Sequence, residues 1–197
     1  MSLARAAVLA LLFIGFAAPV IASDDVLGFR SAGWGATEEQ VVAAEGKDPD
    51  ERLQSGERTE MFYSDKFAGR SCVVGYHFLR GRLARGIYRL ADRPPDYLDY
   101  FTERQAFLRV LVGDYGEPLS DNTYWKYSTF KNYPPRWGTA LAARHMAQFV
   151  RWETEKSVIV LVLGNRGHGV ELTVEFTSKE FVEFESEVKT AVPESSF

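Results

Sequence analysis

An aromatic and basic stretch near the middle of the chain holds the side chains best suited to recognition chemistry. It runs from Asn122 to Trp137 and combines six aromatic rings with three cations. Rings beside cations stack on sugars, peptides or bases, and Trp, Tyr and Arg are enriched among the residues that dominate interfaces. The candidate binding residues are Trp125, Tyr127, Tyr133, Arg136 and Trp137. The alternative is that about half of these rings fill the core.

A series of arginines along a predicted hairpin forms a second candidate surface. Arg85 and Arg89 lie four residues apart on one predicted strand, so both point to the same face. Such a patch suits an acidic partner, a phosphate group or an anionic membrane surface. The alternative is a solvated face whose arginines pair with acids elsewhere. We add Arg85 and Arg89 to the candidate binding residues; the remaining members of the series are Arg70, Arg80, Arg82 and Arg93.

The residue types that enzymes and metal sites use form no recognisable set in this sequence. His77, His145 and His168 stand at no metal-ligand spacing from one another or from Cys72. Cys72 and His77 are five residues apart on one predicted strand, so they point to opposite faces. The glycine-rich loop from Gly164 to Gly169 lacks the lysine and serine of a phosphate-binding loop. We therefore expect no catalytic residue, no metal and no cofactor.

The N-terminus is typical of a secretory signal peptide. Arg5 precedes an apolar run from Ala6 to Ala18, and Val20-Ile21-Ala22 offers small or branched residues for cleavage after Ala22. The run is shorter than the ~20 residues of a membrane-spanning helix. The alternative is an uncleaved anchor. We expect residues 1–22 to be removed and residues 23–197 to form a periplasmic or secreted domain with no later transmembrane span.

The composition indicates which class of partner the chain binds and what kind of interaction stabilises its fold. Removal of residues 1–22 takes away Arg5 and no acid, so the net charge changes from −4 to about −5. This mild acidity argues against nucleic acid as the partner. Cys72 is the only cysteine, so the chain forms no internal disulfide and packing alone stabilises it. A buried thiol is the favoured interpretation, with a reactive or intermolecular one as the alternative.

The predicted elements begin with a helix in which Thr37 and Gln40 form a capping box and Gly46 ends the helix. A loop over residues 47–59 and a short strand over 60–64 follow. A hairpin of strands 72–79 and 82–91 turns at Arg80-Gly81. The second helix runs from Tyr97 to Gly113, with Thr102 as an alternative start and Gly116 as an alternative end. The remaining expected elements are strand 123–130, a helix or extended segment at 138–147, strands 149–153, 157–163 and 170–176, and a helix after Ser178.

This order predicts an α+β fold with an antiparallel sheet and packed helices. Each helix is followed by strands joined by short turns, which indicates two loosely duplicated halves over residues 29–96 and 97–190. Whether the halves form one sheet or two is left open by the sequence.

The segment Gly35-Ala36-Thr37-Glu38-Glu39-Gln40-Val41 after an export signal resembles the start of small bacterial envelope domains. The group includes the small lipoprotein of the outer-membrane β-barrel assembly machinery and the β-lactamase-inhibitor-protein-like fold. The chain departs from the lipoprotein because it has no cysteine after the signal and is longer. The resemblance implies a binding or scaffolding module and supplies no catalytic residues.

The expected function is therefore recognition of a macromolecular partner, an envelope or extracellular protein, by a non-enzymatic exported module. A hydrolase and a small-ligand carrier are the alternatives. A carboxylate cluster with shifted pKa values in a deep pocket would favour the enzyme, and a closed apolar cavity would favour the carrier.

Overall fold

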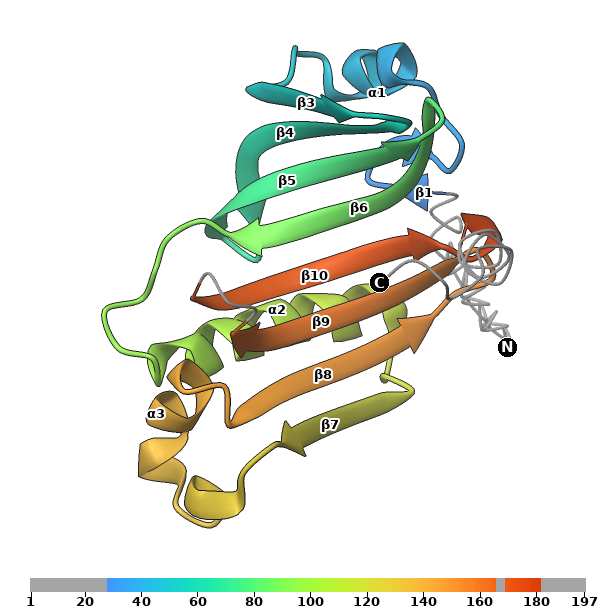
Figure 1. Cartoon of the computed structure of the whole chain (residues 1–197). Helices are drawn as coiled ribbons and strands as arrows, with labels where there is room; N and C mark the ends of the chain where they lie inside the picture. The colour runs from blue at the N-terminus through green and yellow to red at the C-terminus, as the bar shows by residue number, and fades with distance from the viewer. Residues whose placement is uncertain (1–27, 166–168, 182–197) are drawn as a thin grey trace, which may run out of the picture.

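The computed structural model describes residues 28–165 and 169–181, which form an eight-stranded antiparallel sheet with helices packed on it (Figure 1). The order across the sheet is β3-β4-β5-β6-β10-β9-β8-β7. The predicted α+β class is confirmed at this level, although strands predominate. The strands are β3 (Glu51–Ser55), β4 (Arg58–Phe67), β5 (Arg70–Leu79), β6 (Arg82–Leu90), β7 (Ser120–Trp125), β8 (Met146–Glu153), β9 (Ser157–Asn165) and β10 (Val170–Ser178).

The sheet consists of two four-stranded meanders that meet edge to edge. Strands β3 to β6 follow one another in sequence and in space, and so do β7 to β10. The last strand of each meander forms the junction, where β6 pairs antiparallel with β10 through Arg85 opposite Thr177 and Arg89 opposite Thr173. One continuous sheet therefore runs through both halves of the chain.

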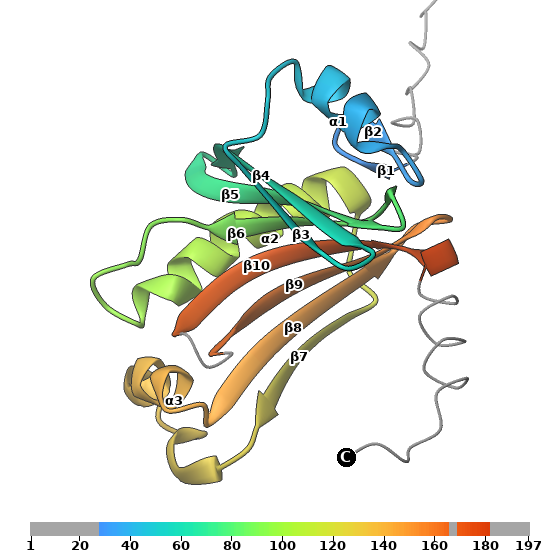
Figure 2. The same cartoon turned by 45° about the horizontal axis from the view of Figure 1, so that its top comes forward.

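The helices lie on one face of this sheet. Helix α2 (Asp99–Tyr115) lies behind β9 and β10 in Figure 1 and contacts both strands. Helix α1 (Glu38–Glu45) sits at the β3 end beside the small β1–β2 ribbon (Gly28–Phe29 and Ala32–Gly33), and α3 (Trp137–Ala142) sits at the opposite end (Figure 2). Two short 3₁₀ helices, η1 (Ser128–Phe130) and η2 (Pro134–Arg136), connect β7 to α3.

Helix α1 and the β5–β6 hairpin form where the local sequence predicted them. The Thr37 side chain accepts a hydrogen bond from the Gln40 amide, and the Gln40 side chain accepts one from the Thr37 amide. Gly46 ends the helix in the left-handed conformation, with φ 69°. The β5–β6 turn places Arg80 and Gly81 at φ 52° and 71°.

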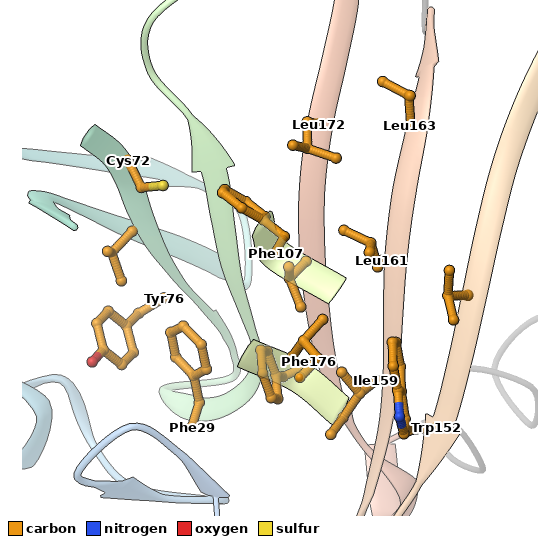
Figure 3. Close-up of a cluster of buried hydrophobic side chains, with 14 of the residues drawn as sticks. Phe29, Cys72, Tyr76, Phe107, Trp152, Ile159, Leu161, Leu163, Leu172 and Phe176 are labelled. Atoms are coloured by element: carbon orange, nitrogen blue, oxygen red, sulfur yellow. The ribbon is translucent and has the colours of Figure 1, made fainter. Parts of the chain in front are cut away.

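The core lies between α2 and the sheet, and Phe29 is at its centre. The Phe29 ring is 1% exposed and lies 5.1 Å from the rings of Tyr76 and Tyr88 and 5.2 Å from that of Phe176, measured between centroids. Figure 3 shows Phe29 between Tyr76 and Phe176, with Phe107 of α2 above them. The two-residue strand β1 therefore anchors the N-terminal ribbon in the main core.

Several predicted boundaries differ from the structure. The predicted loop over residues 47–59 contains strand β3 and the start of β4; β3 is an edge strand with every residue exposed, so it carries no apolar alternation. Helix α2 begins at Asp99, two residues after the predicted start at Tyr97, and not at the alternative start Thr102. The side chain of Asp96 accepts a hydrogen bond from the Leu98 amide just before the first turn. Strand β7 ends at Trp125, where the chain turns into η1.

Other predictions are settled or fall outside the described residues. Helix α2 ends at Gly116, and the segment 138–147 forms α3 followed by the start of β8. The predicted signal peptide, His168 and residues 182–197 of the predicted last helix lie outside the described residues.

Candidate functional site

The sequence-predicted binding residues occupy three separate places. Trp125 and Trp137 are half-buried on the helix-covered side, with ring centroids 6.0 Å apart, and Trp137 also packs on Phe101 of α2. Tyr127, Tyr133 and Arg136 are exposed in the connection between β7 and α3. Arg85 and Arg89 lie on β6 and point to the sheet face opposite α2. The predicted residues therefore do not form one continuous site.

The sheet face opposite α2, which we call the open face, carries none of the helices α1, α2 and α3. Phe181, in the short helical stretch that follows β10, lines a pocket at one end of it. Cross-strand register places Leu53, Glu60, His77 and Arg85 in one row of this face. A second row runs through Phe62, Ile87 and Val160, and a third through Arg89 and Phe149. Leu53 and Phe149 are exposed, whereas Phe62, Ile87 and Val160 are half-buried among their neighbours. The open face thus mixes apolar and charged side chains across both meanders.

A pocket with both apolar and charged lining residues lies at one end of the open face. His77 Nδ1 is 3.0 Å from Glu60 Oε1, and the Phe62 ring meets the imidazole edge-on at 6.1 Å between centroids. The His77 Nε2 atom is buried and has no hydrogen-bond partner in the described part of the chain. The β5–β6 register shifts between His77 and Phe78 at this point, so that His77 lies opposite Arg85 and Phe78 opposite Leu83. The pocket is lined by Arg58, Thr59, Glu60, His77, Phe78, Leu79, Ala84, Arg85, Thr177 and Phe181.

Burial lowers the pKa of His77, and the nearby charge of Arg85 acts in the same direction, whereas Glu60 opposes it. The unfolded chain therefore binds this proton more readily than the folded one. Stability should be complete above about pH 6.5, the ordinary histidine pKa, and should fall as the pH drops below it. We expect this loss between about pH 7 and pH 5 to be smaller in His77→Gln, as measured by urea unfolding. Equal slopes for the two proteins would contradict the assignment.

The connection from Lys126 to His145, which we call the aromatic corner, projects at the β7 end of the molecule (Figure 1). Tyr127 is 52% exposed and Tyr133 57% exposed. The ring of His145 is stacked on Phe130 at 6.1 Å and meets Tyr127 edge-on at 5.0 Å. The corner therefore has a packed interior and an aromatic surface.

Cys72 takes no part in either surface. Its side chain is buried in the core on the α2 side, and burial raises the pKa of the thiol to about 11. His77 points to the other face, so the two residues cannot act as a pair, as the spacing predicted. A neutral buried thiol is a poor nucleophile, which supports the structural interpretation.

Sequence reasoning missed the apolar members of the open face. Phe62, Ile87 and Val160 alternate along their strands with core residues, so the signal was present as the second face of each strand. This alternation could not identify the open face, because the sequence does not say which face of the sheet the helices cover.

No family model, no curated protein and no solved structure matches this chain. Within residues 28–165 and 169–181, no helix is long and apolar enough to cross a membrane. The same residues contain no group of three or more His, Cys, Asp or Glu arranged to hold a metal ion.

Proposed function

We propose that the chain is an exported, non-enzymatic binding module of the cell envelope that recognises a protein partner on its open face. One observation supports this proposal most strongly: α1, α2 and α3 lie on one side of the eight-stranded sheet, and the other side carries apolar and charged residues from both meanders. Protein interfaces combine an apolar centre with such charged neighbours. Export is supported by the sequence of residues 1–22.

Four carboxyl groups of the described residues have shifted pKa values, and none of these shifts is the raised pKa of a catalytic acid. The pKa values of Glu39, Asp50, Asp65 and Glu153 are all lowered, in each case chiefly because the carboxylate accepts a side-chain hydrogen bond. A catalytic acid needs the opposite shift. A hydrolase and a small-ligand carrier are the alternatives to a binding module.

The proposal includes an internal duplication over residues 29–96 and 97–190. Each of these ranges contains a helix followed by a four-stranded meander, and the two meanders meet through their last strands. This arrangement also agrees with the resemblance to envelope domains that begin with a capped helix and continue into an antiparallel sheet. A duplicated sheet doubles the width of the surface that one partner can contact.

The test is a cross-linked capture from envelope extract with the chain from Ser23 onward as bait. The open-face variant is Leu53→Ser with Phe149→Ser, which removes two exposed apolar side chains from opposite ends of the face. We expect recovery of a specific partner to fall about tenfold or more. The matched control is Leu119→Ser with Tyr97→Ser, two exposed apolar residues in connections outside the open face.

Both variants must first show the unfolding midpoint of the parent chain. Capture that is lost in the open-face variant and kept in the control supports the proposal. Equal capture by all three proteins would place recognition elsewhere on the molecule.

A further inference from the structure

The aromatic corner lies within a segment that contains cations and no acid. The chain carries 27 Asp and Glu residues, yet none occurs between Asn122 and Trp152. Lys126, Lys131, Arg136 and Arg144 are all exposed. None of the ion pairs between described residues includes any of these four side chains. The corner is therefore a local positive surface on a protein of net negative charge.

Exposed rings accompany these cations. Tyr127 and Tyr133 each expose more than half of their surface, and the Lys126 ammonium lies 5.4 Å from the centre of the Tyr127 ring. A tyrosine ring has an apolar body and a polar hydroxyl, which suits it to the boundary between lipid headgroups and acyl chains. Lysine and arginine at the same level contact phosphates.

The corner is held in shape by its own backbone contacts. The Lys126 amide donates to the His145 carbonyl at 2.7 Å, and the Arg136 amide donates to the Tyr133 carbonyl at 2.9 Å. The Trp137 indole donates to the Lys131 carbonyl at 3.3 Å. Because these contacts fix the two 3₁₀ turns, the exposed side chains need little ordering when they bind.

We propose that the aromatic corner binds the phosphate headgroups of an anionic lipid membrane and seats the module on that surface. The cations neutralise headgroup phosphates while Tyr127 and Tyr133 enter the interfacial layer. The acidic remainder of the chain is repelled by the same surface, so only this end of the molecule can approach it. The corner projects from the end of the sheet, which allows contact with a flat surface (Figure 2). This inference does not depend on the function proposed for the open face.

The test is co-sedimentation with vesicles of phosphatidylglycerol and phosphatidylcholine in equal parts, compared with vesicles of phosphatidylcholine alone. The protein is the chain from Ser23 onward, which keeps every described element and lacks the apolar run 6–18 that would itself enter a bilayer. We expect binding to the anionic vesicles only, and we expect high salt to abolish it because screening weakens exposed charges.

Two corner variants and one control locate the binding surface. The charge variant combines Lys126→Gln, Lys131→Gln and Arg136→Gln, and should reduce vesicle affinity roughly a hundredfold. The ring variant, Tyr127→Ser with Tyr133→Ser, should reduce it without changing the salt dependence. The control combines Lys66→Gln, Arg109→Gln and Lys156→Gln, which removes the same charge from exposed positions on other elements and should bind like the parent chain.

The proposal is overturned if the parent chain does not bind anionic vesicles, or if the charge variant and the control lose affinity equally. It is also overturned if vesicles fail to bind while polyglutamate binds in a corner-dependent way, because the corner would then recognise an acidic protein. Open-face capture and vesicle binding are separate measurements, so failure of one leaves the other standing.

Discussion

Gly86→Ala is expected to destabilise the folded chain by about 3 kcal/mol, an unusually large cost for the addition of one methyl group. Gly86 lies on β6, and a Cβ atom placed there would overlap the Phe29 ring. Phe29 has no space to move because Tyr76, Tyr88 and Phe176 surround it. Because Gly86 has no side chain, Phe29 of β1 can reach the core. Urea unfolding followed by circular dichroism would measure the change.

A second-site variant tests whether the Phe29 ring is the cause. In a Phe29→Ala background the ring atoms that the methyl group would overlap, Cγ, Cδ1 and Cδ2, are absent, so the added cost of Gly86→Ala should fall to about 1 kcal/mol or less. Gly113→Ala serves as the matched control, because Gly113 lies within α2 and a Cβ there meets nothing within 4 Å. That variant should gain up to about 1 kcal/mol from helix propensity. An unchanged cost of Gly86→Ala in both backgrounds would exclude the ring as its origin.

The contacts of Phe29 illustrate what the sequence could and could not predict. The α1 cap and the β5–β6 hairpin depend on residues close in sequence, so spacing and turn chemistry predict them. The packing of Phe29 against Gly86 and Phe176 joins three elements far apart in the chain, and the β6–β10 junction does the same. No local pattern specifies such pairings.

The candidate site likewise depends on contacts between distant elements, which local sequence patterns do not specify. Three of the six rings between Tyr124 and Trp137 are half-buried and three are exposed, and this division depends on which face of β7 meets α2. Trp125 falls on that side opposite Met146, whereas Tyr127 and Tyr133 lie beyond the strand and remain exposed. Strand β3 was missed because an edge strand with both faces exposed has no hydrophobic alternation to detect.

Arg30→Gln is expected to destabilise the chain by about 3 kcal/mol, because it removes the cation beside the buried Glu45 carboxylate. Arg30 Nε lies 2.9 Å from Glu45 Oε1, and its Nη2 lies 2.5 Å from Asp65 Oδ2. The Glu45 side chain is 5% exposed and also accepts a hydrogen bond from the Tyr76 hydroxyl. Without Arg30, a buried carboxylate loses its only ion-pair partner among the described residues. The measurement is the free energy of unfolding at neutral pH.

Two further variants separate the buried charge from loss of packing. Glu45→Gln in the Arg30→Gln background removes the unpaired charge and should recover a clear part of the lost stability. Arg52→Gln breaks the more exposed pair with Glu38, at 2.7 Å, and should cost less than about 1 kcal/mol. If Arg30→Gln costs no more than Arg52→Gln, the cluster of Arg30, Glu45 and Asp65 does not stabilise the fold as inferred.

Acidification provides an independent check on the same cluster. The hydrogen bond from Arg30 lowers the pKa of Asp65 in the folded state, so the unfolded chain holds this proton more tightly. The resulting stability is present above about pH 4, the ordinary carboxyl pKa, and is lost as the pH falls through the folded-state pKa. Arg30→Gln lacks this contribution at every pH. The stability gap between the parent chain and Arg30→Gln should therefore narrow as the pH is lowered, and a constant gap would show that the Asp65 pair contributes nothing.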